Sequence, residues 1–244
     1  MKVNFEKRDE LDFKTNEAYK TLRTNISFSG DDIKVIAFTS SVPNEGKSFV
    51  TFNLSVSLAE DGKKVLYIDA DIRKSVTIAR YGVDIETKGL AHYLSGQKKL
   101  DDVIYETNID NLDIIFTGQV APNPSELLGN AYFKKMLDIK REEYDYIIID
   151  CPPLGSVIDA AIVAKECDGA IIVIETDNAS YKIVQRVKKQ LEQSGVRILG
   201  AVLNKVEMGG KGYYGKGYYG KSYYGSYYGR YYGDYGSYGN EDKK

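Results

Sequence analysis

The sequence predicts an α/β protein built on a doubly wound, mostly parallel sheet, and two observations carry this prediction. Short runs rich in Val and Ile alternate with longer stretches of helical periodicity along most of the chain. Several of these runs are apolar at consecutive positions, which indicates strands covered by helices on both faces. The chain has 244 residues, of which 43% are hydrophobic, so it can bury one sizeable core. In such a fold a ligand binds beyond the carboxyl ends of the strands.

The strands and helices alternate in the order that a βαβ series requires. The strands are expected at residues 33–39, 64–69, 112–118, 144–150, 169–175 and 196–204. The helices are expected at residues 47–61, 125–140, 157–166 and 179–194.

Three regions are expected along the chain: an N-terminal helical segment at 1–30, the α/β domain at 31–207 and a tail at 208–244. Within the tail, residues 211–239 hold twelve tyrosines and no aliphatic side chain. Glycines flank the paired tyrosines, so this segment cannot form a core and is expected to be disordered.

Charge and cysteine content exclude several classes of protein. The formal net charge is -2, divided between about +3 on residues 209–244 and about -5 on the rest, which is too mild to indicate nucleic-acid binding. Two cysteines and the absence of a signal peptide or an apolar run of about 18 residues suggest a cytoplasmic protein. A single histidine excludes a His-rich metal site.

Residues 40–48, SSVPNEGKS, follow the first Val/Ile-rich strand and open a helix, which is the context of a phosphate-binding loop. Backbone amides of such a loop converge on phosphate oxygens, while Lys47 neutralises their charge and the Ser48 hydroxyl can bind Mg²⁺. The match departs from the motif where Ser41 replaces the first glycine, and an incidental Gly-Lys-Ser at a helix start is the alternative. The predicted nucleotide contacts here are Ser41, Pro43, Asn44, Glu45, Gly46, Lys47, Ser48 and Phe49.

Three carboxylates follow buried strands. Asp69 and Asp71 end the run VLYIDADIR, just before Arg73, and Asp150 ends the run YIIID. Carboxylates at the ends of buried strands are costly unless cations or hydrogen bonds compensate them. A metal–nucleotide site would provide both, whereas solvated strand-end aspartates are the simpler alternative.

The stretches TSSVPNEGKS, IDADIRKS and IIIDCPP resemble the Walker A, Walker A′ and Walker B motifs of the bacterial tyrosine kinases, the BY-kinases. The resemblance covers essentially the whole chain and points to the free-standing cytoplasmic kinases of the Gram-positive type. It implies a P-loop NTPase fold of the MinD/ParA-like group. It also implies an ATP-dependent protein-tyrosine autokinase that regulates the synthesis and export of capsular or other extracellular polysaccharide.

The resemblance assigns roles to the predicted site residues. Lys47 and the loop amides would hold the β- and γ-phosphates of ATP. Ser48, Asp71 and Asp150 would organise Mg²⁺, and Asp69 would orient or deprotonate the acceptor tyrosine, whose pKa is ordinarily about 10. Asn204, at the end of the last strand, resembles an adenine-contacting position, although a capping or turn Asn fits the sequence equally well.

The family phosphorylates tyrosines near its C-terminus in trans, within a ring of subunits. The acceptors implied here are Tyr213, Tyr214, Tyr218, Tyr219, Tyr223, Tyr224, Tyr227, Tyr228, Tyr231, Tyr232, Tyr235 and Tyr238. Each phosphorylation would add a charge of about -1.5 to -2, which makes the tail a graded switch. A Tyr/Gly-rich segment that self-associates or binds RNA through stacking is the alternative.

The N-terminal run NEAYKTLRTNI resembles the E-x-x-R-x-x-R element through which the family assembles, and the matching residues are Glu17, Lys20 and Arg23. Their spacing places them near one face of a helix. Lys20 replaces the first Arg and lacks its bidentate fork, so a weaker or different assembly is expected. A solvated helix face is the alternative.

Partners and location follow from the family alone. The resemblance implies a transmembrane activator of the polysaccharide co-polymerase type, recruitment to the inner face of the cell membrane, a homo-oligomeric ring such as an octamer, and a cognate tyrosine phosphatase. ATP and Mg²⁺ are the implied cofactors, and no nucleic-acid partner is expected.

Two other functions fit parts of the sequence. A positioning ATPase of the ParA/MinD type shares the fold and the aspartates, but it carries a signature Lys where this chain has Val42. A tail-driven scaffold with a purely structural nucleotide is the second alternative, for which Lys47→Met would leave function intact.

Overall fold

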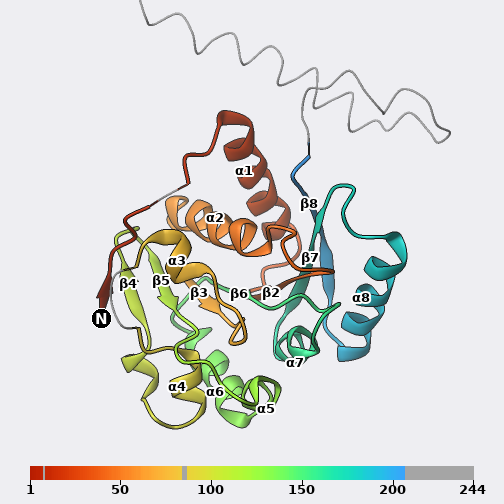
Figure 1. The fold of residues 1–244 in the computed structure, drawn as a ribbon. Coiled ribbons are helices and arrows are strands. Elements are labelled where there is room, and N and C mark those ends of the chain that lie inside the picture. The colour runs from red at the N-terminus through yellow and green to blue at the C-terminus, as the bar shows by residue number, and fades with distance from the viewer. Residues whose placement is uncertain (8, 84–86, 207–244) are drawn as a thin grey trace, which may run out of the picture. The chain divides into compact units, whose positions relative to one another are not determined.

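The computed structural model describes residues 1–7, 9–83 and 87–206, which fold around one twisted sheet (Figure 1). Within these residues the sheet has eight strands in the order β1-β4-β5-β3-β6-β2-β7-β8, and only the pairing of β4 with β5 is antiparallel. The strands are β1 Lys2–Val3, β2 Val35–Ser40, β3 Val65–Asp69, β4 Tyr105–Thr107, β5 Leu112–Ile115, β6 Tyr146–Asp150, β7 Gly169–Glu175 and β8 Ile198–Asn204. The predicted mostly parallel sheet is confirmed.

Helices cover both faces of this sheet, so the fold has three layers (Figure 1). The helices are α1 Phe13–Ser27, α2 Lys47–Glu60, α3 Thr77–Tyr81, α4 Leu90–Leu94, α5 Pro124–Leu128, α6 Ala131–Lys140, α7 Asp159–Ala164 and α8 Tyr181–Ser194. One buried cluster includes side chains of α1, α2 and α3, and a second includes side chains of α4 to α8. Apolar strand residues contribute to both clusters, as continuous hydrophobic runs require.

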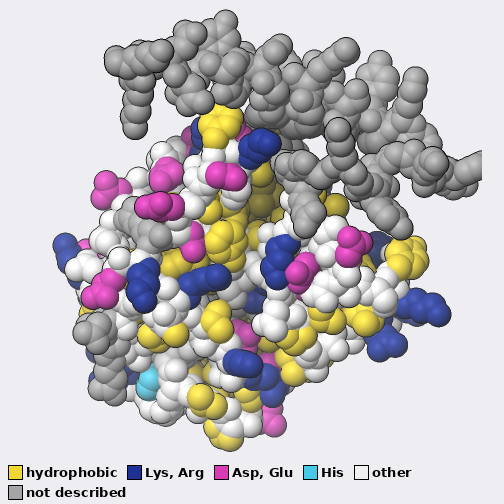
Figure 2. All heavy atoms as spheres, turned by 45° about the horizontal axis from the view of Figure 1, so that its top comes forward, with side chains coloured by type: hydrophobic (Ala, Val, Ile, Leu, Met, Phe, Trp, Pro, Cys, Tyr) yellow, Lys and Arg dark blue, Asp and Glu magenta, His cyan; other side chains and the backbone are white. Residues whose placement is uncertain are grey.

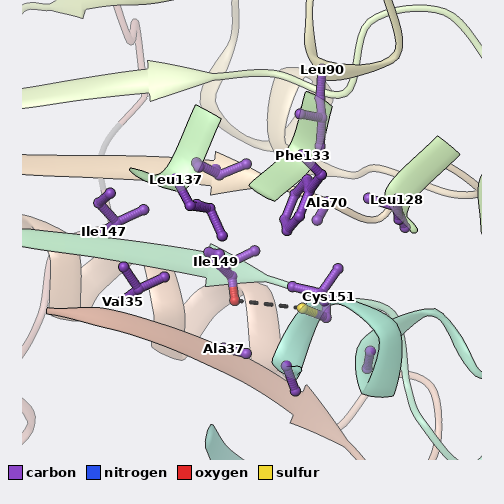
Figure 3. Packing of buried hydrophobic residues seen from close by; sticks show 14 of the residues in the cluster. Val35, Ala37, Ala70, Leu90, Leu128, Phe133, Leu137, Ile147, Ile149 and Cys151 are labelled. Atoms are coloured by element: carbon purple, nitrogen blue, oxygen red, sulfur yellow. Dashed lines mark hydrogen bonds between the residues drawn. The ribbon is translucent and has the colours of Figure 1, made fainter. Parts of the chain in front are cut away.

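The alternation of side chains along β6 decides which strand-end groups meet α2. Ile147, Ile149 and Cys151 point into the cluster of α4 to α8, where they pack among residues such as Phe133 (Figure 3). Asp150 therefore points to the opposite face, toward α2. On the neighbouring strand β3, Tyr67 and Asp69 point to this same face by the same rule.

The helix predicted at 125–140 is wrong as a single element, since α5 ends at Leu128 and α6 begins at Ala131. The side chain of Asn130 accepts hydrogen bonds from the backbone N–H groups of Tyr132 and Phe133 and so caps a new helix. The sequence pattern also leaves out β1 and β4, because runs of two and three residues are too short to show a period.

The N-terminal segment contributes helix α1, whose side chains pack in the cluster with α2. Asp12 caps this helix by accepting a hydrogen bond from the Thr15 N–H at 2.7 Å. The predicted tail and its tyrosines lie outside the described residues, and the predicted region boundaries stay predictions. Among the described residues, no helix is both long and apolar enough to cross a bilayer.

The face of the molecule shown in Figure 2 carries Lys, Arg, Asp and Glu side chains interspersed over its described part. Neither sign of charge dominates this view.

Candidate functional site

The loop between β2 and α2 presents a helix start to a ligand. Gly46 precedes α2 with φ of 81°, a left-handed conformation that glycine adopts without strain. Within the described chain no side chain caps this helix, so its first amides are available to an anion. This geometry matches the phosphate-binding loop that the sequence predicts.

The buried Glu45 side chain holds the loop in place through hydrogen bonds to backbone amides. Its carboxylate accepts hydrogen bonds from the Ser41 N–H at 2.6 Å and from the Val42 N–H at 2.8 Å, and also from the Glu175 N–H of β7 at 3.2 Å. Glu45 is 1% exposed. The first two amides of the loop are therefore occupied by this carboxylate, and the amides from Glu45 onward are the better phosphate donors.

Ser41 fills the first position of the loop without a partner for its hydroxyl among the described residues. Its carbonyl oxygen lies so close to Gly155 that a Cβ there would meet it at 2.0 Å. Thr39 adds a hydrogen bond from its hydroxyl to the Pro152 carbonyl at 2.8 Å. The segment after β6 thus packs directly on the backbone of the loop.

Lys47 and Asp150 form a buried ion pair. The Lys47 ammonium donates to the Asp150 carboxylate and, at 3.2 Å, to the Ser48 hydroxyl. Burial lowers the pKa of Lys47, but the attraction and hydrogen bond of Asp150 outweigh this and leave the pKa above its usual value. The lysine is therefore a fixed positive charge at the mouth of the loop.

Asp69 lies beside Asp150, since the two residues are partners in the β3–β6 register. Burial, and then the charge of Asp150, raises the pKa of Asp69 to about 7. Ser75 and Thr77 donate hydrogen bonds to the Asp69 carboxylate at 2.5 and 2.6 Å. These bonds hold the carboxylate in one orientation, at a pKa suited to proton transfer near neutral pH.

Asp71 lies two residues beyond Asp69 and is partly exposed. Its carboxylate accepts a hydrogen bond from the Lys74 N–H at 3.0 Å. Burial raises the pKa of Asp71, and the positive charge of Lys47 opposes that rise. Asp71 is thus close enough to Lys47 to share its electrostatic field.

Four of the predicted groups, Lys47, Asp69, Asp71 and Asp150, are therefore brought together at the carboxyl ends of β3 and β6. Ser48 joins them through its contact with Lys47. Among the described residues, no cluster of three or more His, Cys, Asp or Glu could hold a metal by itself. Ser48, Asp71 and Asp150 nevertheless supply oxygens of the kind that Mg²⁺ takes, since it usually binds one or two carboxylates and completes its shell with water and phosphate. Both oxygens of Asp150 already accept hydrogen bonds, from Lys47 and from Tyr67.

Asn204 is also brought to this loop, where its side-chain amide donates to the Glu45 carbonyl at 2.9 Å. Its contact with adenine stays a prediction. Phe49 is half-buried, and the Arg80 guanidinium lies over its ring at 5.2 Å from the centroid. Both residues border the start of α2.

Glu17, Lys20 and Arg23 lie elsewhere, on α1. Lys20 donates to the Glu17 carboxylate at 2.7 Å on the exposed surface of the helix. Arg23 donates to the Ser57 carbonyl of α2 at 2.9 Å and pairs with Asp61 at 3.0 Å. Arg23 therefore ties α1 to α2 within one chain, while its predicted role between subunits stays a prediction.

Sequence reasoning missed a buried tyrosine at the site. Tyr67 donates its hydroxyl proton to the Asp150 carboxylate at 3.3 Å, and it is fully buried. Burial raises the pKa of Tyr67 far above its usual value, so the hydroxyl stays protonated. The signal in the sequence was a polar group two residues before Asp69, on the same face of the strand.

Sequence reasoning also missed an ion pair near the aspartates, between Arg73 and Asp159. Arg73 donates to both carboxylate oxygens of Asp159, at 2.6 and 3.0 Å, and to the Ser125 hydroxyl at 3.0 Å. Asp159 begins α7 and is 1% exposed. This bidentate contact joins the segment after β3 to the helix that follows β6. The charge types were visible in the sequence, but their pairing was not.

Fold and site together define a P-loop nucleotide-binding protein: a loop opening a helix after a central strand, its lysine bound to a strand-end aspartate. A family model described as an AAA domain matches residues 33–198. The chain is 43% identical over 231 residues to the tyrosine-protein kinase CpsD of Streptococcus agalactiae, covering 95% of this chain and 93% of that protein. It belongs to the bacterial tyrosine-protein kinases.

Solved structures agree with this assignment. The kinase domain of the Escherichia coli tyrosine kinase ETK matches with a TM-score of 0.77 and 35% identity, over 83% of this chain and 80% of that one. The septum site-determining protein MinD of Pyrococcus horikoshii, solved with Mg-ADP, matches with a TM-score of 0.61 and 31% identity over 70% of each chain. The predicted family, kinase activity and MinD-like P-loop fold are confirmed.

Proposed function

We propose that this kinase transfers the γ-phosphate of ATP to tyrosines at 213–238 of a second copy of the chain, and that this regulates the synthesis and export of extracellular polysaccharide. The observation that carries the proposal is the grouping of Lys47, Asp69 and Asp150 at the mouth of the loop. It supplies a fixed positive charge and a carboxylate with a raised pKa beside one phosphate site.

The reaction is an in-line displacement at the γ-phosphorus. The tyrosine Oη forms the new P–O bond as its proton passes to the Asp69 carboxylate, and the bond to the β–γ bridging oxygen breaks to release ADP. Lys47 and the amides from Glu45 onward hold the phosphate oxygens as negative charge shifts toward the leaving group. Most of the rate enhancement thus comes from positioning and charge neutralisation.

Mg²⁺ would neutralise phosphate charge when bound. Ser48, Asp71 and Asp150 are the residues proposed to hold it. Because Asp150 is bonded to both Lys47 and Tyr67, its orientation is already fixed before any ligand enters. Asp71 is less buried, and the hydrogen bond that its carboxylate accepts from the Lys74 N–H sets the orientation of that carboxylate.

Assembly and regulation are proposed from the family. We place the subunit contact on α1, where the Glu17–Lys20 pair is exposed, and we expect a ring such as an octamer. A transmembrane activator would recruit the kinase to the inner face of the cell membrane, and a phosphatase would reset the tail. Each phosphate adds a charge of about -1.5 to -2, so several phosphates would make the tail acidic.

The test places the ATP-binding site and the acceptor tyrosines on two different chains. A Lys47→Met chain keeps its tail but lacks the phosphate-binding lysine, and a chain with all tail tyrosines changed to Phe keeps its site but lacks acceptors. Each is incubated with labelled ATP and Mg²⁺, alone and mixed, in the presence of the cytosolic segment of a candidate activator. Label is expected on the Lys47→Met chain in the mixture only. Label on that chain alone, or none in the mixture, would contradict the proposal.

A further inference from the structure

The residues that end β8 are hydrogen bonded to the loop between β2 and α2. Lys205 donates from Nζ to the Asn44 carbonyl at 3.1 Å, and the neighbouring Asn204 donates to the Glu45 carbonyl at 2.9 Å. The contact is close, because a Cβ on Gly46 would meet the Asn204 side-chain nitrogen at 2.1 Å. Two consecutive carbonyls of the loop are thus anchored to two consecutive residues of the last strand's end.

Asn204 and Lys205 are in turn hydrogen bonded to residues at the end of β7. Lys205 pairs with the Glu175 carboxylate at 2.8 Å, and the other oxygen of that carboxylate accepts from Asn178 at 2.7 Å. The Thr176 N–H donates to the Asn204 carbonyl at 3.1 Å. Lys205 and Asn204, whose side chains donate to the loop, are therefore held in place by hydrogen bonds to the end of β7.

Peptide geometry turns these contacts into an orientation of the loop amides. All peptide bonds of the described chain are trans, and in a planar trans unit the carbonyl and the following N–H point in opposite directions. Anchoring the carbonyls of Asn44 and Glu45 to the β8 end thus turns the N–H groups of Glu45 and Gly46 away from it. Left-handed conformations at Asn44 and Gly46, with φ of 69° and 81°, complete a concave run of amides of the kind that binds anions.

We infer that Lys205, together with Asn204, is a positioning residue that holds the amides of Glu45 and Gly46 in the orientation that binds the phosphates of ATP. This inference rests on the proposed use of the loop for ATP. It gives Asn204 a function apart from its predicted adenine contact, and it gives Lys205 a function outside the Walker motifs. A purely structural role for Lys205, as the ion-pair partner of Glu175, makes a different prediction.

Direct titration of the full-length protein with a fluorescent ADP analogue and Mg²⁺ measures this effect without catalysis. Lys205→Met is expected to weaken binding about tenfold, roughly the loss of the one hydrogen bond that orients the Glu45 amide. Lys205→Arg, which keeps the donor, should stay within about threefold of the wild type. Glu175→Gln removes the charge of the ion pair but keeps a side-chain oxygen that can accept from Lys205, so the contact with Asn44 is retained and binding should also stay within about threefold of the wild type.

Lys188→Met is the matched control, because Lys188 is 48% exposed and paired with Glu192 while Lys205 is 49% exposed and paired with Glu175. The control should bind the analogue as the wild type does. In phosphorylation assays Lys205→Met should raise KM for ATP about tenfold with kcat changed less than about twofold, because the reacting groups are untouched. Without nucleotide, the melting temperatures of Lys205→Met and Lys188→Met should both stay close to that of the wild type.

A dissociation constant for Lys205→Met within twofold of the wild type would overturn the inference. So would a Glu175→Gln variant that weakens binding as much as Lys205→Met does, since the ion pair alone would then account for the effect. If the wild type binds the analogue but phosphorylates no tyrosine, the proposed function fails and the titration still tests the role of Lys205. If the wild type binds no analogue, both fail.

Discussion

Asp69 and Asp150 lie side by side at the ends of neighbouring parallel strands, each 1% exposed. Two buried carboxylates in this position repel each other, and the repulsion contributes to the raised pKa of Asp69. The Lys47 ammonium is bonded to Asp150 and not to Asp69 in the described contacts. Asp150 is therefore bound to a cation, and Asp69, whose pKa is raised to about 7, is the carboxylate that we propose takes up the proton.

Asp69→Asn tests that division. The amide keeps the shape of the carboxylate but cannot accept the tyrosine proton, so the rate of phosphotransfer should fall by about 100-fold or more. Nucleotide binding should change by less than about threefold, as measured by titration with a fluorescent ADP analogue. Asp138→Asn, in an exposed pair with Lys134, serves as the control and should leave both quantities unchanged. A full rate with Asn at position 69 would refute the assignment.

Tyr67→Phe removes one buried hydroxyl from the site. Because that hydroxyl donates to Asp150, the variant should lose about 0.5–1.5 kcal/mol in the free energy of unfolding. It should also slow phosphotransfer by less than about tenfold, since Asp150 keeps Lys47. Tyr144→Phe removes a similar bond, at 2.6 Å to Asp113, away from the site. Urea unfolding should show comparable losses for both variants, and only Tyr67→Phe should alter the rate.

Gly155→Ala places a methyl group against the loop. Its Cβ would lie 2.0 Å from the Ser41 carbonyl oxygen, which is backbone and cannot rotate aside. The loop must shift, so nucleotide binding should weaken at least about tenfold and stability should fall by about 1–3 kcal/mol. Gly200→Ala is the control, because nothing lies within 4 Å of a Cβ there. Equal binding by the two variants would show that the loop tolerates the displacement.

Arg73→Gln should destabilise the protein in a pH-dependent way. Burial would raise the pKa of Asp159, but hydrogen bonds from Arg73 and Ser125 outweigh it and hold the pKa below its usual value of 3.8. A lowered pKa stabilises the folded wild type above pH of about 4, and this contribution is lost as pH falls through the folded-state pKa. The variant should lose about 2 kcal/mol at pH 7, less than a fully buried pair because Arg73 is 39% exposed.

Urea unfolding at pH 7 and pH 3 measures this difference. The gap between wild type and Arg73→Gln should narrow at pH 3, because this pH lies below the usual pKa of the carboxyl and the unfolded chain then binds a proton that the folded wild type resists. The double variant Arg73→Gln/Asp159→Asn should recover much of the loss at pH 7, because it leaves no buried charge unpaired. A gap that is the same at both pH values would show that packing, and not the charge of Asp159, causes the loss.

Features carried by contiguous residues were predictable from the sequence. The run GAIIVIE matches β7 at both ends, and α2 begins at Lys47, where the predicted helix begins. The positions of Asp69 and Asp150 at strand ends follow from where their apolar runs stop. Each of these depends on local hydrophobic pattern and on the order of residues along the chain, which need no knowledge of distant contacts.

Tertiary structure decided what depends on residues far apart in sequence. The Arg73–Asp159 pair joins residues 86 positions apart, and the bond from Lys205 to the Asn44 carbonyl joins residues 161 positions apart. Glu45 could have faced solvent, but β7 offers it an amide and the loop offers two more, so it is buried. The sequence by itself determined the class of fold, the loop and the aspartates. Only the pairing of β7 with β2, and of β8 with β7, decided how the loop is held, because hydrogen bonds between distant segments form only after the strands are in register.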